Sequence, residues 1–217
     1  MKKGILLLAG FVIWTILIMN VNVKPIGPEG TSVGFAALNG WFHQLTGTHM
    51  TIYTVTDWMG LVPVVVCMMF GFVGLFQWVR RRNLLKVDFD ILSLGVYYIV
   101  VILGYLFFEM IPMNYRPILI EGRLEASYPS STTLLVLSVM PTLIFQAKQR
   151  VKNATWQKVI VRFASAFSTF MVVGRMVSGV HWLTDIVGAA LLSSGLFYTY
   201  KGGVLWWNSI KNYKNKE

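Results

Sequence analysis

Six apolar runs, each long enough to cross a lipid bilayer, occupy most of the sequence. They lie at roughly residues 4–20, 58–79, 90–108, 131–146, 160–178 and 182–200 of the 217. A transmembrane helix needs about 20 mainly apolar residues, because the hydrocarbon core of a bilayer is about 30 Å thick. The pattern predicts an all-α, polytopic membrane protein, in which residues 1–217 form a single membrane domain built as a six-transmembrane-helix bundle.

The amino-acid composition excludes most soluble alternatives. Hydrophobic residues make up 55% of the chain and aromatic residues 14%, whereas only 13% are charged. A soluble domain typically carries about 25% charged residues, and a disordered chain combines few aromatic residues with high charge. The single cysteine, Cys67, excludes a disulfide framework and a cysteine zinc cluster. Because it lies in an apolar run, we expect it to be a buried structural thiol.

Positive charge is distributed unevenly between the segments that connect the apolar runs. The sequence holds 19 Lys and Arg against 9 Asp and Glu, a net charge of +10. On one side of the predicted bundle lie 15 of the 19 basic residues, namely Lys2, Lys3, Arg80, Arg81, Arg82, Lys86, Lys148, Arg150, Lys152, Lys158, Arg162, Lys201, Lys211, Lys214 and Lys216. The other side holds only Lys24, Arg116, Arg123 and Arg175. Cytoplasmic segments are enriched in Lys and Arg, so both termini are predicted to be cytoplasmic and no nucleic-acid partner is expected.

The first apolar run follows Lys2 and Lys3, as the hydrophobic part of a signal peptide would. However, the segment after it, Asn20–Lys24, offers no small-residue cleavage site. We therefore expect a retained anchor in a multi-pass protein of the cell (plasma) membrane.

The segment between the first two runs is predicted to form an amphipathic helix at the outer membrane face. Apolar residues recur there at helical spacing, at Phe35, Leu38, Trp41, Phe42 and Leu45. We expect this helix to rest on the bilayer as a lid. His43 and His49 have no carboxylate at ligand spacing, so they are interpreted as surface or interface histidines.

A cation, an imidazole and a carboxylate occur together at the predicted outer ends of the last two spans, as Arg175, His181 and Asp185. Charge at membrane depth is costly, so its presence indicates a function. If a helix begins near His181, Asp185 lies one turn further on the same face, where it can accept a ring N–H and leave the other nitrogen free to attack. Gly179 favours a sharp turn that would let Arg175 face His181. A buried His-Asp pair that merely caps a helix remains the alternative.

A second outer segment, residues 109–133, contains groups that can bind phosphate. Ser130 or Ser131 is predicted to begin a span, whose first turn offers free backbone N–H groups to an anion. Arg116 lies on the same side as Arg175, and two planar guanidinium groups can clamp a phosphate. Two arginines, a hydroxyl-rich helix start and a His-Asp pair together favour phosphoryl transfer to histidine.

The order of these motifs resembles the type 2 phosphatidic acid phosphatase family over about residues 55–200. The family's third motif is Ser-Arg-x5-His-x3-Asp, which appears here as Gly174-Arg175-x5-His181-x3-Asp185, with Gly174 in place of the serine. Arg116-Pro117 matches the end of the first motif, Lys-x6-Arg-Pro, and Pro129-Ser130 matches the start of the second, Pro-Ser-Gly-His. The resemblance implies a six-span helical bundle with all three motifs on its outer face.

The resemblance also implies a role for each matching residue. His181 would be the nucleophile that forms a phosphohistidine, and Asp185 would orient it. Arg116, Arg175, Ser130 and the amides that follow, beginning with Ser131, would bind the phosphate oxygens. No metal or other cofactor is implied, because histidine and the arginines supply what a metal otherwise would.

Two positions depart from the family pattern. Glu109 stands in place of the first-motif lysine, and Thr132 stands in place of the second-motif histidine, which in the family is the acid for the leaving group. Loss of such an acid typically costs about 10² to 10⁴ in rate. We therefore expect either a preference for a lipid diphosphate, whose leaving phosphate needs a proton less, or a substitute acid at Glu109, Glu121 or Glu125.

These features predict an integral-membrane phosphatase that hydrolyses a lipid phosphate or diphosphate at the extracytoplasmic face. Polyprenyl diphosphate, phosphatidic acid and phosphatidylglycerol phosphate are the expected types of substrate, and the lipid bilayer is the expected surroundings. A catalytically impaired lipid-phosphate binder or transporter, and a phosphotransferase, remain alternatives. The lipid tail, the head group and the oligomeric state stay open at this point.

Overall fold

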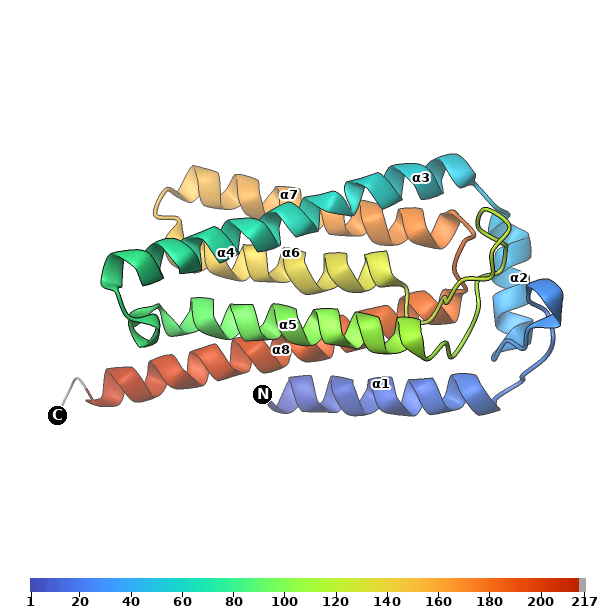
Figure 1. Cartoon of the computed structure of the whole chain (residues 1–217), viewed down its shortest axis with the longest axis horizontal. Coiled ribbons are helices and arrows are strands. Elements are labelled where there is room, and N and C mark those ends of the chain that lie inside the picture. The colour runs from blue at the N-terminus through green and yellow to red at the C-terminus, as the bar shows by residue number, and fades with distance from the viewer. Residues whose placement is uncertain (215–217) are drawn as a thin grey trace.

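Six long helices run side by side in the computed structural model, which describes residues 1–214 (Figure 1). They are α1 (Lys2–Asn20), α4 (Leu61–Arg81), α5 (Phe89–Met110), α6 (Ser131–Arg150), α7 (Ala154–Val177) and α8 (Leu183–Lys214). The shorter elements are α2 (Ala36–Thr46), α3 (Met50–Met59) and the 3₁₀ turns η1 (Pro28–Gly30) and η2 (Leu84–Lys86). Within the described residues the only β structure consists of isolated bridges, so the predicted all-α fold class is confirmed.

Five helical segments are long and apolar enough to cross a membrane, namely Lys2–Asn20, Met50–Arg81, Phe89–Met110, Ser131–Arg150 and Ala154–Val177. The expected count of six apolar spans is therefore not confirmed, because α8 is not among them. This helix contacts α1, α2, α5, α6 and α7, and its residues Thr184, Asp185 and Ser193 are fully buried. Polar side chains lower the mean hydropathy of a helix. When they face other helices and not lipid, the helix can still pack inside a membrane bundle.

The second span begins earlier than its apolar run indicates. The run was expected at residues 58–79, whereas helix α3 starts at Met50 and continues into α4 through Gly60, which has helical dihedral angles. The Thr54 and Thr56 hydroxyls donate to the carbonyls of Met50 and Ile52 one turn back. Internal bonds of this kind let polar residues extend a helix beyond its apolar part. As a result α3 reaches the end of the bundle where α2 lies (Figure 1).

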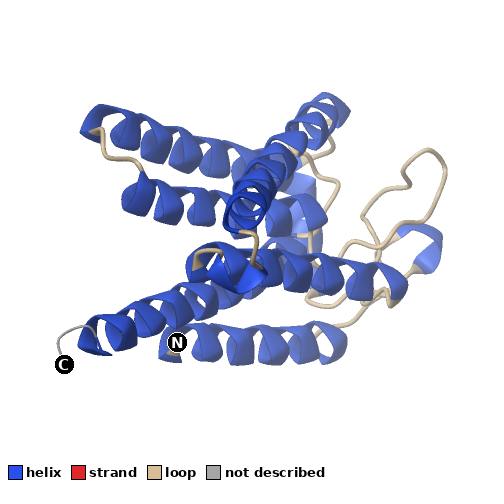
Figure 2. Cartoon of the chain, turned by 60° about the vertical axis from the view of Figure 1, so that its left-hand side comes forward, coloured by secondary structure: helices blue, strands red, loops and turns tan. Residues whose placement is uncertain are grey.

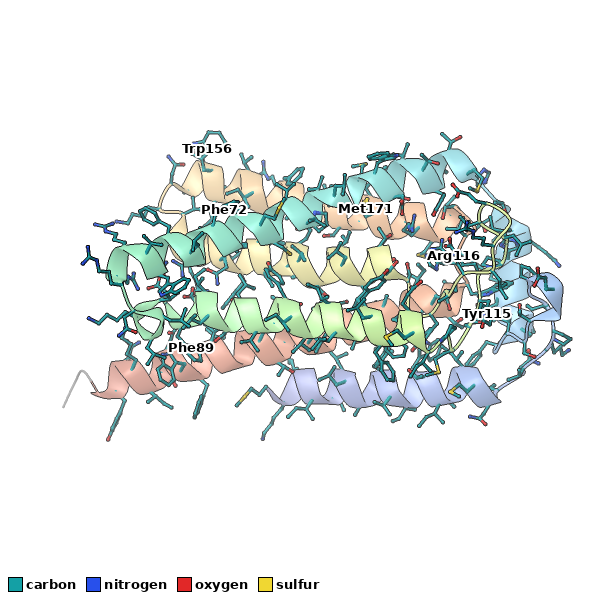
Figure 3. The ribbon with its side chains drawn as sticks, viewed as in Figure 1. Phe72, Phe89, Tyr115, Arg116, Trp156 and Met171 are labelled. Atoms are coloured by element: carbon teal, nitrogen blue, oxygen red, sulfur yellow. The ribbon has the colours of Figure 1, made fainter. Side chains whose placement is uncertain are left out.

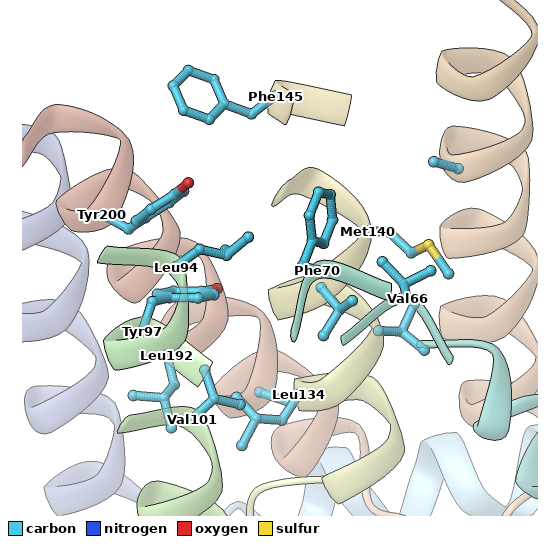
Figure 4. Packing of buried hydrophobic residues seen from close by; sticks show 14 of the residues in the cluster. Val66, Phe70, Leu94, Tyr97, Val101, Leu134, Met140, Phe145, Leu192 and Tyr200 are labelled. Carbon is cyan, nitrogen blue, oxygen red and sulfur yellow. The ribbon is translucent and has the colours of Figure 1, made fainter. Parts of the chain in front are cut away.

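The interior of the bundle is packed with side chains from all six long helices. Figure 4 shows Phe70 of α4, Leu94 and Tyr97 of α5, Leu134 of α6 and other members of this buried cluster. The Tyr97 hydroxyl donates to the carbonyl of Ser138 at 2.9 Å, which satisfies a polar group inside the core. The core therefore fixes α5 against α6 by both apolar packing and hydrogen bonding.

Large apolar side chains also cover the outside of the bundle. Phe72 on α4 is 68% exposed and Trp156 on α7 is 64% exposed (Figure 3). A soluble protein seldom displays apolar surface this widely. An apolar outer surface around an apolar core is what a bundle surrounded by lipid requires, and it is consistent with a multi-pass membrane protein.

One end of the bundle is tied by ion pairs. Arg150 at the end of α6 contacts Asp88 at 3.0 Å and Asp90 at 2.7 Å, and Arg81 of α4 contacts Asp88 at 2.8 Å. The start of α1 and the last turns of α8 point away from α2 and the loop that follows α5 (Figures 1 and 2). Lys216, one of the cations counted on the inner side, lies outside the described residues.

Helix α2 crosses the opposite end of the bundle (Figure 1). It forms where the apolar spacing predicts an amphipathic helix, and its Trp41 and Leu45 are 59% and 68% exposed. His43, on the same helix, packs against Trp182, with 5.6 Å between ring centroids. Helix α2 therefore covers the turn between α7 and α8.

Candidate active site

His181 lies in the tight turn between α7 and α8. Gly179 adopts a φ of +68°, and a Cβ atom there would lie 1.9 Å from the carbonyl oxygen of Gly47. Only glycine fits a left-handed position with such a close neighbour. The His49 amide donates to the carbonyl of Ser178 at 2.9 Å, so the segment before α3 holds the turn. The turn leaves His181 only 3% exposed.

The hydroxyl of Ser127 lies between His181 and Asp185. The His181 Nδ1 atom is 3.9 Å from Asp185 Oδ2, which is too far for a hydrogen bond. Ser127 Oγ lies 3.1 Å from this Nδ1 and donates to Asp185 Oδ2 at 2.5 Å. A hydroxyl has a single proton, so Nδ1 carries its own hydrogen and donates it to Ser127. The direct contact expected between the imidazole and the carboxylate is thus replaced by a serine bridge.

The carboxylate of Asp185 is held by further donors. The Trp182 amide donates to Oδ2 at 2.9 Å, and the Asn114 amide group donates to Oδ1 at 3.3 Å. Asn114 is itself joined to Ser127, whose backbone N–H donates to the Asn114 carbonyl at 2.9 Å. The carboxylate is therefore fixed in place before any ligand binds.

Arg116 reaches the site from a hairpin-like loop. The loop is closed by the Arg116 amide, which donates to the Glu125 carbonyl at 3.1 Å, and by the pairing of Ile120 with Arg123. The Arg116 guanidinium lies 3.2 Å from the Glu125 carboxylate, and the residue is 8% exposed. Figure 3 shows Arg116 at the end of the bundle that α2 crosses.

Arg175 reaches the site from α7 and packs against α3. Its guanidinium contacts the Tyr53 carbonyl at 3.4 Å, the Thr56 hydroxyl at 3.3 Å and Asp57 Oδ1 at 3.4 Å. It also lies 4.9 Å from the centroid of the Tyr53 ring, and the Arg116 guanidinium lies 5.7 Å from the same centroid. The Tyr53 ring therefore gathers both arginines, which are otherwise far apart in the sequence.

Four buried nitrogen atoms of the two arginines and His181 have no hydrogen-bond partner among the described residues. They are Arg116 Nε, which lies 3.2 Å from the Glu125 carboxylate, Arg116 Nη1, Arg175 Nε and His181 Nε2. Buried polar atoms are nearly always paired, so unpaired ones indicate room for a ligand. Arg116 Nη1 and Arg175 Nε are cationic donors, which suits an oxyanion, and His181 Nε2 is a ring nitrogen.

The electrostatics of the site keep the imidazole neutral. Burial lowers the pKa of His181 well below its ordinary value, and the positive charges of Arg116 and Arg175 lower it further. With a hydrogen on Nδ1, the neutral ring has its free electron pair on Nε2. A neutral ring nitrogen with a free electron pair can act as a nucleophile or a base, and here the charges of Arg116 and Arg175 reach it.

The start of α6 forms the next wall of the site. Ser130 is fully buried at the N-cap position, where its amide donates to the Asp185 carbonyl at 3.2 Å and its hydroxyl to Thr133 at 3.0 Å. The expected helix start is confirmed, but both polar groups of Ser130 are already engaged. Ser131 lines a small pocket together with His181. Its amide belongs to the first turn of α6, where backbone N–H groups lack intrahelical partners.

A groove of about 260 Å³ adjoins this pocket through shared lining residues Tyr105 and Ser131. Its remaining wall comes from α3, α5 and α6, including Asp57, Ile102, Thr132 and other mainly apolar residues. Most of this groove is apolar, so it is suited to part of a lipid chain near the phosphate.

The three carboxylates expected as substitute acids lie at different places. Glu109 is exposed and lines the small pocket with His181. Glu125 is paired with Arg116, and Glu121 lies exposed at the tip of the loop. The structure also reveals Asp57, which the sequence analysis missed.

Other residues of the site were missed as well, namely Tyr53, Thr56, Asn114 and Ser127. Thr56 and Asp57 lie three and four residues after Tyr53, which places each of them on the same helix face as Tyr53. That spacing is a signal in the sequence. Asn114 and Ser127 carry no comparable signal, because they meet only when the loop closes.

Comparison with solved structures shows the same fold in a crystal structure of a transmembrane PAP2-type phosphatidylglycerolphosphate phosphatase from Bacillus subtilis. The TM-score is 0.62 at 16% sequence identity, and the match covers 93% of this chain and 96% of the other. A search of curated proteins finds no match. The model of the PAP2 superfamily matches residues 91–209, which is more than half of the chain and includes every site residue except those on α3. The chain therefore belongs to the PAP2 superfamily.

Proposed function

We propose that the chain is a membrane phosphatase that hydrolyses a lipid phosphate or diphosphate through a phosphohistidine on His181. The observation that carries this proposal is that buried nitrogen atoms of Arg116, Arg175 and His181 have no hydrogen-bond partner, while both guanidinium groups lie over the Tyr53 ring and lower the pKa of His181. Two cationic donors and a neutral nucleophile are what an in-line attack on phosphorus requires. Membership of the PAP2 superfamily and the fold shared with a lipid phosphatase support the same reaction class.

The reaction has two steps. In the first, the electron pair of His181 Nε2 forms a bond to phosphorus, and the bond from phosphorus to the leaving oxygen breaks. Arg116 and Arg175 neutralise the phosphate oxygens, while Ser127 and Asp185 stabilise the imidazolium through its Nδ1 hydrogen. In the second step, water attacks phosphorus and the P–N bond breaks, which returns its electron pair to Nε2 and releases phosphate.

The groove beside Ser131 supports a lipid as the substrate. It is mainly apolar and runs between α3, α5 and α6, whose outer surfaces are apolar as well. A lipid lying in this groove would place its phosphate next to Arg175, because Asp57 both lines the groove and contacts that arginine. Polyprenyl diphosphate, phosphatidic acid and phosphatidylglycerol phosphate are the candidate types.

The charge asymmetry of the connecting segments supports an orientation for this reaction. Fifteen of the 19 basic residues belong to the predicted inner segments, and the four others belong to the predicted outer ones. We place both termini in the cytoplasm and the active site at the outer face of the cell membrane.

The test is phosphate release from a panel of lipid phosphates by purified wild type, His181→Ala and His49→Ala. We expect release by wild type and by the exposed control His49→Ala, and none by His181→Ala. Acid-labile, base-stable phosphate on wild type during turnover would identify the phosphohistidine. Unchanged release by His181→Ala would exclude the proposed nucleophile. If wild type binds these lipids but releases no phosphate from any of them, the chain is a lipid-phosphate binder.

A further inference from the structure

The first step of the proposed reaction needs a proton at the leaving oxygen. An alkoxide leaves a phosphate monoester poorly, and a positioned acid typically contributes about 10² to 10⁴ in rate. His181 is already used as the nucleophile, and the hydroxyls of Ser131 and Thr132 are too weakly acidic to donate a proton outright. Tyr105 lines both the pocket and the groove, but a phenol is a far weaker acid than a carboxyl group, so a carboxyl group is the stronger candidate at this place.

Asp57 is the carboxylate that lines the groove proposed for the lipid. It lies near the end of α3 and shares this groove with Ser131 and Thr132. Its Oδ1 atom is 3.4 Å from Arg175 Nη2, and its side chain is 56% exposed, whereas that of Arg175 is 1% exposed. One edge of the carboxylate therefore touches an arginine proposed to bind phosphate, and the rest is open to the groove.

The contact with Arg175 explains how Asp57 can take up a proton when substrate binds. A phosphate that binds Arg175 competes with Asp57 for the same guanidinium group. It also brings negative charge beside the carboxylate. Losing a cationic partner and gaining an anionic neighbour both favour the protonated form of a carboxyl group. The acid would then form only in the complex, next to the leaving oxygen.

The other two carboxylates are placed less well. Glu125 is paired with Arg116 at 3.2 Å and lines neither the pocket beside His181 nor the groove. Glu109 lines the pocket, but so does Ser127, which binds the Nδ1 side of the imidazole. The attacking atom is Nε2, and in an in-line attack the leaving oxygen lies on the far side of phosphorus from it, away from the Nδ1 edge that Ser127 binds.

We propose that Asp57 is a further catalytic residue, the acid that protonates the leaving oxygen and the base that then activates water. This inference rests on the proposed function. As the bond from phosphorus to the leaving oxygen breaks, the oxygen takes the proton of the Asp57 carboxyl group. In the second step, the Asp57 carboxylate takes a proton from the attacking water, whose oxygen bonds to phosphorus as the P–N bond breaks. The carboxyl group ends in the protonation state in which it began.

The experiment compares a good and a poor leaving group on one lipid. Farnesyl monophosphate releases an alkoxide, whereas farnesyl diphosphate releases a phosphate that needs little protonation. We expect Asp57→Asn to lower kcat/KM for the monophosphate by roughly 10² or more and for the diphosphate by less than about 10-fold. Asp57→Glu should recover most of the monophosphate activity, because it restores a carboxyl group. Glu109→Gln and Glu125→Gln are the matched controls and should change both substrates to a similar extent.

Each result decides between a catalytic and a merely structural Asp57. If Asp57→Asn lowers both activities equally while keeping the wild-type thermal unfolding temperature, Asp57 only positions Arg175 and the inference is wrong. The same holds if Glu109→Gln or Glu125→Gln gives the selective loss instead. If Asp57→Asn does not fold, Asp57→Glu becomes the test. The ratio of kcat/KM for the monophosphate to that for the diphosphate should then stay near the wild-type ratio. A large fall in this ratio in folded Asp57→Glu would overturn the inference. If wild type releases no phosphate from either lipid, the result would instead count against the proposed function.

Discussion

At the scale of single residues, the site depends on a hydroxyl group that joins two side chains too far apart to bond. Ser127 Oγ contacts both His181 Nδ1 and Asp185 Oδ2, which are 3.9 Å from each other. Asp185 lies in the first turn of α8 and His181 in the turn before it, so the backbone alone does not bring them into contact. Through Ser127, the Asp185 carboxylate therefore holds the His181 ring in a fixed orientation.

Replacing Ser127 with Ala is therefore expected to lower kcat by about 10- to 100-fold, the usual effect of removing a group that orients a functional side chain. KM should change little, because Ser127 is not among the atoms proposed to bind phosphate. Ser127→Thr keeps the hydroxyl and should retain much of the activity. The measurement is steady-state phosphate release from a lipid phosphate. An Ala variant with wild-type kcat would show that the bridge does not matter for the reaction.

The second prediction at this scale concerns pH. Burial, together with Arg116 and Arg175, lowers the pKa of His181 well below the ordinary value of about 6.5. Protonation removes the free electron pair, so the ring should stay neutral and able to attack at pH 6.5 and be protonated only at lower pH. Arg116→Gln removes one positive charge and should move this titration back toward the ordinary value.

The chain has three histidines, so the ring of His181 can be followed by NMR of histidine-labelled protein, with His181→Ala to assign its signal. We expect this signal to titrate well below the ordinary histidine value of about 6.5. Titration of His181 at or above pH 6.5 in wild type would contradict the prediction, as would an unchanged titration in Arg116→Gln.

At the scale of elements, the turn between α7 and α8 controls where the imidazole lies. Gly179→Ala would put a methyl group at a φ of +68° and against the Gly47 carbonyl. Strain of this kind costs about 1 to 3 kcal/mol before any steric clash, so we expect the unfolding temperature to fall by roughly 5 °C or more and activity to fall with it. Gly203→Ala on α8 is the control, because a Cβ there meets nothing within 4 Å. Equal stability of the two variants in a thermal unfolding assay would contradict this role.

The elements also show what can be predicted from sequence and what cannot. Apolar length locates the long helices, because a lipid-facing helix requires it, and the spacing of Arg175, His181 and Asp185 locates the turn. Helix α3 was not predicted, because its threonines and Asp57 interrupt the apolar pattern. In the structure the Thr54 and Thr56 hydroxyls bond within the helix, and Asp57 contacts Arg175. Contacts such as Ser127 with His181 arise only from tertiary packing, which no local pattern encodes.

At the scale of the whole molecule, the ion pairs among the described residues are divided between the two ends of the bundle. One end carries the ion pairs of Arg81 and Arg150 with Asp88 and Asp90. The other carries the pocket with His181, covered by α2 and by the loop of residues 111–130 (Figure 1). Apolar helix surface separates the two ends, so in a bilayer they face opposite aqueous compartments.

This separation makes the proposed orientation testable with single cysteines. The natural Cys67 would first be replaced by Ala, which leaves a chain without cysteine. Glu121, exposed at the tip of the loop on the active-site side, and Lys86, exposed between α4 and α5, each then receive a cysteine. A membrane-impermeant maleimide added to intact cells should label Glu121→Cys at once and Lys86→Cys only after the membrane is permeabilised. The reverse pattern would place the active site in the cytoplasm, because the two positions lie at opposite ends of the same helices and cannot share a compartment.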